Sequence, residues 1–444
     1  STFAARVHYV IGFAVAVDYF LLWLAPMAGQ GAVHKQLLLP YLGPIYERMD
    51  NSPLLRKFAE TFIYQRPKHA DYFTTQLLFI LNFIPLLGFA FYWQLVHGEL
   101  PWWLLILYNF GWVGLGSRCV GAAYFMAHKE SHNGMLYKPW IRQTVGNVFE
   151  NWFGCFYGSV PNNFTTTHIS LHHRLDGGQG DTLYCWDINR SSWPEFLIYQ
   201  CRGLLHMSGF GALRQFHCTP HVVGHNRAFW KLLRGIVGYW VVLPVVVIGM
   251  TGSVFFYFWI VLQPLVCMSF FLALINMGFH AFIENDEQGL RIPGVESITL
   301  VHGNDDFFGE DDHAAHHNYI NVYWRDLPAL QQKMEPEWAR YHSSVFQGFD
   351  IFSFSMFILL KAWPLLADRY VDTSGKLSKA EICEMLQRRV THREMEHDRL
   401  LPSMPAKRPK GYSSAPNAEH EEGSRQYKVL LGRLAKVQLG IASV

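Results

Sequence analysis

The stretch from Phe307 to Tyr319 reads F-F-G-E-D-D-H-A-A-H-H-N-Y and holds three histidines within five positions. On a helix, His313 and His317 share one face, and His316 lies beside them. Neutral imidazole is the commonest side-chain ligand of transition metals, so this spacing could present several nitrogens to one metal centre. A polar surface helix would have a similar local sequence, and the rest of the chain decides between the two interpretations.

Further histidines occur in short groups upstream of this stretch. These groups read H-K-E-S-H, H-I-S-L-H-H and N-M-G-F-H. Together with the first stretch they give nine candidate metal ligands, which are His128, His132, His168, His172, His173, His280, His313, His316 and His317. Nine imidazoles exceed the needs of one tetrahedral zinc ion, but they suit two metal ions that keep open positions.

The composition indicates a membrane protein. Of the 444 residues, 50% are hydrophobic and 16% are charged, whereas soluble domains carry about 25% charged residues. The net charge of +2 gives no argument for a nucleic-acid partner. The seven cysteines are odd in number and form no C-x-x-C pair, which argues against a disulfide framework and against a thiolate zinc site.

Four apolar segments are long enough to cross a bilayer. They are Phe73–Val96, Pro101–Ala127, about Leu232–Met250, and Val254–Phe282. Short turns at residues 98–99 and 251–253 would join them into two hairpins, each returning to the side on which it began. We therefore predict an all-α integral membrane protein in which two transmembrane helical hairpins carry a metal-binding helical cap on one face.

This topology places every histidine group on the same side of the membrane. The two hairpin turns are nearly free of Lys and Arg, whereas the histidine-bearing segments are rich in them. By the positive-inside rule, the histidine face is cytoplasmic, or faces the matrix or stroma. If helical, Pro101–His132 and Val254–Phe282 would each exceed ~40 Å, longer than the ~30 Å hydrocarbon core. The surplus should project from the membrane and carry the histidines at its end.

These motifs, in this order and topology, resemble the membrane-bound fatty acid desaturase and hydroxylase superfamily over roughly residues 70–320. That superfamily has three histidine boxes arranged around two membrane hairpins. The N-M-G-F-H group resembles the additional N-x-x-x-H element of acyl-CoA desaturases. The resemblance implies a non-haem diiron centre with the nine histidines as ligands, and it implies that Asn276 contacts a metal through water.

The resemblance further implies oxygen-dependent desaturation of a membrane lipid or acyl substrate, with molecular oxygen (O2) and two electrons consumed. No H-P-G-G haem-binding element occurs, so we expect the electrons to come from a separate carrier of the cytochrome b5 or ferredoxin type. The third box begins with His rather than Gln, which disfavours the subgroup with a fused haem domain. The family default is the endoplasmic reticulum, and an organellar membrane such as the mitochondrial inner membrane is the alternative.

Two other functions stay open. A lipid hydroxylase of the same superfamily would share every motif. A desaturase-fold accessory or structural subunit of a larger membrane complex, with or without iron, would explain the long extensions at both ends. The boxes do not specify the acyl substrate, the carbon attacked or the substrate-binding residues.

Several residues near the boxes allow two interpretations. Asp176, Asp181, Asp311 and Asp312 either accept hydrogen bonds from ligand imidazoles or belong to solvated acidic loops. A further row of histidines at four-residue spacing consists of His217, His221 and His225. Pro220 and Gly224 disfavour a regular helix there, so we predict an interfacial loop without ligands.

The sequence divides into four parts. Residues 1–72 form a membrane-associated or interfacial extension, whose apolar segment Val7–Leu24 could cross a bilayer once or lie in its interface. Residues 73–330 form the desaturase-like core. Residues 331–401 hold an interfacial helix at Phe349–Leu366 and a C-terminal helical segment. Residues 402–444 are a linker and a short amphipathic tail.

Two shorter stretches complete the prediction. Val148–Val160 is too short and polar to span a bilayer, and we expect it to be interfacial or re-entrant. Tyr370–Glu381 half-resembles a calcium-binding EF-hand loop but begins with Tyr instead of Asp. We favour a helix capped near Ser378.

Overall fold

The computed structural model describes residues 39–113, 120–173, 180–218, 225–285, 292, 294–303 and 308–394. The segment Val7–Leu24, the linker at 402–423 and the amphipathic tail at 426–444 lie outside these residues. Asp176 and His221 also lie outside the described part of the chain.

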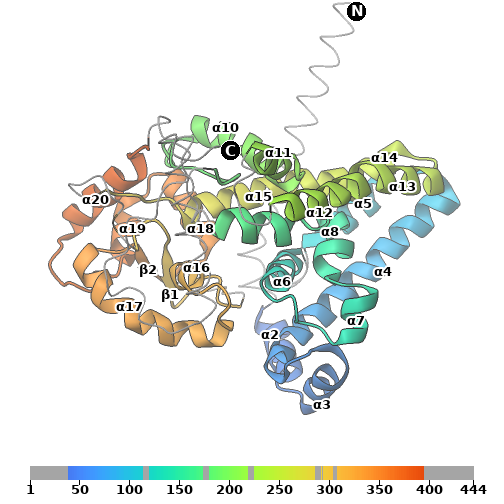
Figure 1. Cartoon of the computed structure of the whole chain (residues 1–444), viewed down its shortest axis with the longest axis horizontal. Helices are drawn as coiled ribbons and strands as arrows, with labels where there is room; N and C mark the ends of the chain where they lie inside the picture. Colours follow the sequence, from blue (N-terminus) through green and yellow to red (C-terminus); the bar gives the residue numbers. More distant parts are fainter. Residues whose placement is uncertain are drawn as a thin grey trace, which may run out of the picture.

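The first part of the chain is helical and contains the first two histidine boxes (Figure 1). Its elements are α2 (Leu39–Asp50), α3 (Pro53–Phe58), the π-helix η2 (Ala59–Ile63), the 3-10 helix η3 (Pro67–Tyr72), α4 (Phe73–His97), α5 (Trp102–Val113), α6 (Val120–His132), α7 (Pro139–Thr144), the π-helix η5 (Phe149–Phe153), α8 (Gly154–Tyr157) and the π-helix η6 (Phe164–His172).

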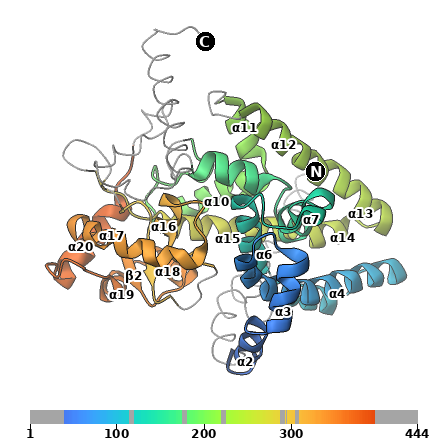
Figure 2. The ribbon, with the colours of Figure 1, turned by 60° about the horizontal axis from the view of Figure 1, so that its bottom comes forward.

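The second part is also helical and adds two short strands (Figure 2). Its elements are α10 (Trp193–Met207), α11 (Phe210–Cys218), α12 (His225–Val237), the π-helix η7 (Gly238–Val242), α13 (Leu243–Thr251), α14 (Val254–Tyr257), the π-helix η8 (Phe258–Leu262), α15 (Gln263–Phe279), β1 (Thr299–Val301), α16 (His313–Asn318), the 3-10 helix η9 (Trp324–Asp326), α17 (Leu327–Tyr341), β2 (Val345–Gln347), α18 (Ile351–Leu359), α19 (Trp363–Arg369) and α20 (Lys379–Thr391).

Three helical stretches of the described residues are long and apolar enough to cross a membrane, namely Pro67–His97, Asn226–Thr251 and Val254–Phe279. They correspond to three of the four predicted spans. The fourth predicted span is described as α5 and α6, with residues 114–119 outside the description. The apolar composition of these helices is that of a membrane protein.

The turns between the apolar helices lie where the sequence predicts them. Helix α4 ends at His97, and Gly98 caps it with a left-handed φ of 77°. Helix α13 ends at Thr251, where Gly252 caps it with φ 64°. Ser253 then begins α14, and its hydroxyl accepts a hydrogen bond from the backbone N–H of Phe256 at 3.1 Å.

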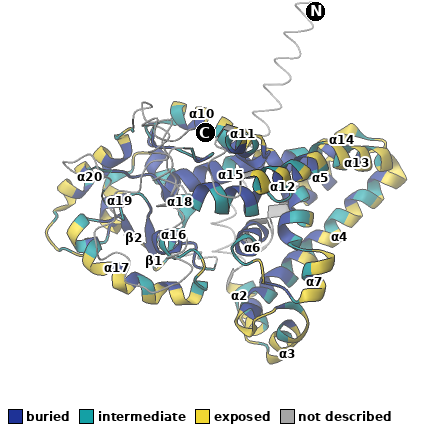
Figure 3. Ribbon diagram, viewed as in Figure 1, coloured by how far each residue is buried: buried dark blue, intermediate teal, exposed yellow. Residues whose placement is uncertain are grey.

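The helix that contains Asn276 lies at the centre of the molecule. In the most apolar window of Val254–Phe279, 61% of the residues are buried, against 28% for Asn226–Thr251. Figure 3 shows α15 mostly buried, whereas α4 and α13 expose much of their surface. Exposed apolar side chains such as Leu81 and Val245 give these outer helices an apolar face, which suits contact with lipid.

Helices α10 and α18 both pack against α15. The segment after α15 includes β1, which pairs in parallel with β2 from Thr299↔Val345 to Val301↔Gln347. The sequence analysis predicted only helices and missed this two-stranded ladder. It fixes the chain on either side of α16, which carries the third histidine box.

Phe349–Leu366 was predicted as one helix, and this prediction is wrong. The structure has two helices, α18 and α19, separated near Lys361, whose φ is 56°. Pro364 explains the break, because proline lacks an N–H and is tolerated only in the first turn of a helix, where it lies in α19. Val148–Val160 consists of η5, α8 and a following loop, so it does not form one spanning helix.

The predicted loop around His217 is also corrected. His217 lies exposed in the last turn of helix α11, and α12 begins at His225. Pro220, His221 and Gly224 lie outside the described residues. The cap predicted at Ser378 is confirmed, because Ser378 and Glu381 form a capping box at the start of α20.

Candidate metal centre

The first histidine box lies at the end of α6. His128 and His132 are one helical turn apart, and their Nε2 atoms are 2.9 Å from each other. Both side chains point to the same side because residues four apart share a helix face. The helix thus projects two imidazoles from its C-terminal turn.

The second box lies on the π-helix η6, and this geometry divides its three histidines. The backbone N–H of His173 donates to the carbonyl oxygen of His168, five residues earlier. His168 and His173 therefore share one face, with their Nε2 atoms 2.9 Å apart. His172 lies between them in sequence and joins a different group of rings.

The third box and His280 come from α16 and from the end of α15. His280 caps the C-terminus of α15, and its Nε2 lies 3.1 Å from Nε2 of His313. The three histidines of α16 are all buried. His316 joins the first group of rings, whereas His313 and His317 join the group of His172 and His280.

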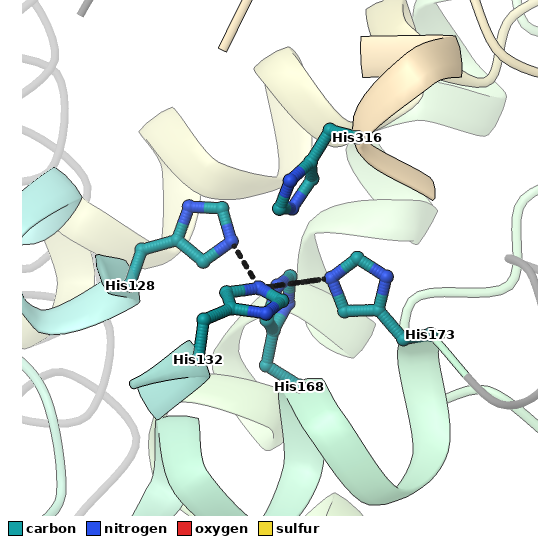
Figure 4. Close-up of side chains that lie close together, drawn as sticks. All are labelled: His128, His132, His168, His173 and His316. Atoms are coloured by element: carbon teal, nitrogen blue, oxygen red, sulfur yellow. Dashed lines mark hydrogen bonds between the residues drawn. The ribbon is translucent and has the colours of Figure 1, made fainter. Parts of the chain in front are cut away.

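The structure thus gathers all nine predicted histidines into two clusters. The five-histidine cluster consists of His128, His132, His168, His173 and His316, and the four-histidine cluster consists of His172, His280, His313 and His317. Figure 4 shows the five rings converging from α6, η6 and α16. The clusters touch each other, because the ring centroids of His173 and His317 are 4.7 Å apart.

The arrangement of the nitrogen atoms suits a metal ion in each cluster. Metal–nitrogen bonds of about 2.1 Å at right angles place neighbouring nitrogens about 3.0 Å apart. The Nε2 separations of 3.1 Å for His132–His173 and 3.2 Å for His132–His168 match this value. In addition, Nε2 of His316 is buried without a hydrogen-bond partner among the described residues, which suits an atom that binds a metal.

Burial lowers the pKa of several of these imidazoles, which favours the neutral form that metal binding requires. It lowers the pKa of His132, His168 and His173 well below the usual value, and neighbouring histidines lower it further. The same causes lower the pKa of His313 and His316.

Carboxylates fix the orientation of one histidine in each cluster. Nδ1 of His128 lies 2.7 Å from Oε1 of Glu310, and Nζ of Lys129 lies 2.7 Å from the same oxygen. Burial opposes the ionisation of Glu310, but His128 and Lys129 together lower its pKa to about 2. An ionised Glu310 accepts the Nδ1 proton of His128, which leaves the Nε2 lone pair directed into the cluster.

Asp181 has the same role for His172, as one of the two sequence interpretations predicted. Its Oδ2 lies 2.5 Å from Nδ1 of His172, and its Oδ1 accepts the N–H of Leu183 at 3.0 Å. Burial opposes the ionisation of Asp181, but His172 and Leu183 lower its pKa below the usual value. Nδ1 of His280 is oriented by a backbone group instead, the carbonyl oxygen of Glu296 at 3.0 Å.

Two buried glutamates that the sequence analysis did not single out connect the first two boxes. Glu130 accepts hydrogen bonds from Tyr137 Oη at 2.6 Å and from the N–H groups of Phe149 and Glu150. Glu150 in turn accepts the N–H of Thr165, at the start of η6, at 2.7 Å. Glu130 stands inside H-K-E-S-H, but only the folded chain shows which backbone groups it binds.

The remaining predicted site residues lie close to the clusters. Asn276 is one turn before His280, and its amide nitrogen donates to Leu183 O at 3.2 Å and to Tyr199 Oη at 3.0 Å. Asp312 is the residue before α16, and its side chain accepts a hydrogen bond from Gln331. Asp311 lies beside it and is buried.

These features define a class: a helical membrane protein with two adjacent histidine clusters that could each hold a metal ion. The family model described as fatty acid desaturase matches residues 101–349, more than half of the chain. The chain belongs to the fatty acid desaturase family, so the resemblance read from the histidine boxes is confirmed. No curated protein and no solved structure matches the chain in the corresponding comparisons.

Proposed function

We propose that this protein is an oxygen-dependent desaturase that introduces a double bond into the acyl chain of a membrane lipid or acyl substrate. The observation that carries the proposal is the convergence of nine imidazoles into a group of five and a group of four. A purely structural protein has no physical need for so many buried or partly buried imidazoles in contact with one another. Membership of the desaturase family supports the same conclusion.

The proposed cofactor is a pair of non-haem iron ions, one in each cluster. His128, His132, His168, His173 and His316 would bind one ion, and His172, His280, His313 and His317 would bind the other. The two irons supply the activation of molecular oxygen that removal of hydrogen from an unactivated methylene requires. We further propose that the Asn276 carbonyl oxygen accepts a hydrogen bond from a metal-bound water.

Residues around the clusters hold three of the ligand histidines in one tautomer. Glu310, Asp181 and the carbonyl of Glu296 each face an Nδ1 atom of a cluster histidine, at 2.7, 2.5 and 3.0 Å. A proton held at each Nδ1 leaves Nε2 free of hydrogen and able to bind a metal. The chain thereby orients its ligands before a metal binds.

The proposed reaction consumes four electrons for each molecule of oxygen. Two come from the acyl chain, which loses two hydrogens and gains a double bond, and two come from a reduced carrier protein. With protons from the solvent, oxygen leaves as two molecules of water. We propose a separate carrier of the cytochrome b5 or ferredoxin type as the electron donor.

A lipid analysis tests this proposal. We expect cells that produce the protein to accumulate an unsaturated acyl species, and cells that produce His316→Ala to lack it. His217→Ala is the matched control, because His217 is an exposed histidine outside both clusters. Accumulation of the same unsaturated species in cells that produce His316→Ala would contradict the proposal.

Isotope labelling separates the proposed reaction from its alternative within the family. Under ¹⁸O₂, a desaturase product gains a double bond without label, whereas a hydroxylase product retains one labelled oxygen. A labelled hydroxyl group on the product would identify a lipid hydroxylase. An accessory subunit of a larger complex would give neither product.

A further inference from the structure

A cluster of basic and aromatic side chains lies beside the metal centre, where η3 meets η9. We call Arg66, Lys68, Tyr323, Trp324 and Arg325 the entry surface. Tyr323 Oη donates to the carbonyl oxygen of Lys68 at 2.8 Å, and the Lys68 ammonium lies 4.6 Å from the centre of the Tyr323 ring. These contacts hold together two segments that are far apart in the sequence.

A partly buried carboxylate, that of Asp71, connects the residues of this surface. Asp71 contacts Nε of Arg325 at 2.6 Å and Nη1 of Arg56 at 2.9 Å, and it accepts the hydroxyl proton of Tyr323. Residues 56–71 and 323–326 together contain five Lys or Arg against three Asp or Glu. These segments therefore carry an excess of positive charge, although Lys68 is paired with Asp326 at 3.9 Å.

Aromatic rings connect the entry surface to the five-histidine cluster. The Trp324 and Phe308 ring centroids are 5.7 Å apart. Two residues after Phe308, Glu310 contacts Nδ1 of His128 at 2.7 Å. The route from Trp324 to a cluster histidine thus consists of one ring contact, a short stretch of backbone and one hydrogen bond.

The backbone at Phe308 supports a specific role for this ring. Phe308 has a φ of 57°, and Gly309 follows with a φ of 75°. A left-handed conformation is unfavourable for a bulky residue and persists only where the surroundings impose it. A Cβ at position 309 would lie 3.1 Å from Cβ of Trp324, so this conformation brings the loop against Trp324.

A second route reaches the same cluster. The rings of Tyr323 and the buried His69 have centroids 6.0 Å apart. Nε2 of His69 lies 3.1 Å from Nδ2 of Asn133, the residue that follows His132. Both routes begin at the entry surface; the first ends at His128 and the second at Asn133, the residue after His132.

We infer that the entry surface is the docking site of an acidic one-electron carrier protein, and that Trp324 and Phe308 lead its electron to the five-histidine cluster. In each encounter the reduced carrier would lose one electron and an iron held by the five-histidine cluster would gain it, so two encounters would supply one turnover. The inference rests on the proposed function, because only a redox enzyme needs such a carrier. Basic side chains attract an acidic partner and speed its association.

Anionic lipid headgroups would also be attracted to basic residues near a membrane span. The aromatic connection to His128 favours a protein that delivers electrons, because a lipid has no need of it. The experiment therefore uses nanodiscs of phosphatidylcholine with and without phosphatidylserine. Binding of the carrier in neutral nanodiscs is the result we expect.

The first test measures the affinity of the full chain for soluble cytochrome b5 and for a plant-type ferredoxin at low salt. We expect at least one to bind, and Arg66→Glu with Lys68→Glu to weaken that binding about tenfold. The matched control is Lys376→Glu with Lys379→Glu, which reverses two exposed charges at the start of α20. The control variant should bind as the wild type does.

The second test separates docking from electron transfer. Phe308→Leu should leave the carrier affinity unchanged, because Phe308 lies outside the entry surface, but it should slow carrier-driven reduction of the metal at least tenfold. Phe308→Tyr, which keeps the ring, should restore the rate. Reduction by dithionite should be equally fast in all variants, which shows that the metal is present and reducible.

These outcomes distinguish the inference from the proposed function. If the wild type contains iron and forms product, but Arg66→Glu with Lys68→Glu binds both carriers normally, the docking site is wrong and the enzyme assignment stands. Failure of both carriers to bind the wild type, or a loss confined to phosphatidylserine-dependent binding, would also overturn it. Absence of iron and product in the wild type would instead contradict the proposed function.

Discussion

The five-histidine and four-histidine clusters draw on adjacent residues of the same boxes, yet they differ in their surroundings. In the five-histidine cluster, His132, His168 and His173 are only partly buried, whereas all members of the four-histidine cluster are buried. The first cluster also lies next to the entry surface. This difference indicates that one cluster is accessible from the protein surface and the other is enclosed.

The supports of the two clusters differ as well. Each cluster has one carboxylate beside a histidine, Glu310 for His128 and Asp181 for His172. Glu310 also contacts the ammonium group of Lys129. In the four-histidine cluster, the indole N–H of Trp186 donates to the carbonyl oxygen of His280 at 2.9 Å. The loop of Trp186 is in turn bound to the end of α20, because Glu394 N–H donates to Trp186 O at 3.0 Å.

One buried arginine joins these segments. Arg190 donates to the carbonyl oxygens of Ala281, Arg389 and His392 at 2.9, 2.7 and 2.6 Å. We call Arg190 and the end of α20 the C-terminal clasp. Helix α20 lies beyond residues 101–349, which the family model matches. Hydrogen bonds thus connect the enclosed cluster to a part of the chain outside the matched range.

The largest predicted effect comes from removing one ligand of each cluster. His316 and His317 are neighbours on α16 but belong to different clusters. We expect His316→Ala and His317→Ala each to abolish desaturation and to lower the iron content by about half, because each empties one site of a two-metal centre. Elemental mass spectrometry and lipid analysis provide the two measurements, with His217→Ala as control. Full iron in either variant would show that the clusters are not separate sites.

The next effect concerns the carboxylates that orient the histidines. Glu310→Gln and Asp181→Asn should each weaken iron binding about 10–100-fold, as loss of a partner to a metal ligand does. Iron binding should weaken at the five-histidine cluster in Glu310→Gln and at the four-histidine cluster in Asp181→Asn. Titration with a competing chelator measures the affinities, and Glu335→Gln on the exposed face of α17 is the control. Equal loss from both clusters in one variant would contradict their independent support.

A smaller effect should distinguish the clusters by their supports. Arg190→Met would leave several buried carbonyls without their donor, at a cost of about 3 kcal/mol in the free energy of unfolding. We expect iron in the four-histidine cluster to become more labile, while iron in the five-histidine cluster stays bound. The rate at which a chelator removes iron measures the first effect, and unfolding of the protein in detergent measures the loss of stability. Uniform loss of iron would mean that the clasp stabilises the whole fold instead.

The smallest effect tests the clasp from its far end. Ser378→Ala removes the capping box of α20 and should lower the stability of that helix by about 1 kcal/mol. The rate of hydrogen exchange at the α20 amides should rise about fivefold, and the iron content of the protein should not change. A loss of iron from the four-histidine cluster would show tighter coupling between α20 and the metal centre than we expect.

Much of this arrangement follows from local sequence patterns. Apolar length predicts three of the membrane helices, and the glycines at 98 and 252 mark their ends. Four-residue spacing places His128 and His132 on one helix face. Such features depend on residues that are close in the sequence, so their physical cause is visible without the fold.

Other features depend on contacts between distant segments. The division of His172 from His168 and His173 follows from the i→i+5 hydrogen bonds of a π-helix, a rare element that the spacing of the box did not predict. The pairing of His128 with Glu310 joins residues that are far apart in the chain. The break near Lys361 was missed although Pro364 gave a local signal, because the apolar run through 349–366 favoured one helix.

The central claim is that each cluster holds one iron ion, and the iron content of the purified chain tests it most directly. Elemental mass spectrometry on protein prepared without chelators should find about two irons per chain, as a two-metal site requires. Zinc alone, or no metal in a well-folded preparation, would contradict the claim and would favour an accessory subunit of desaturase fold.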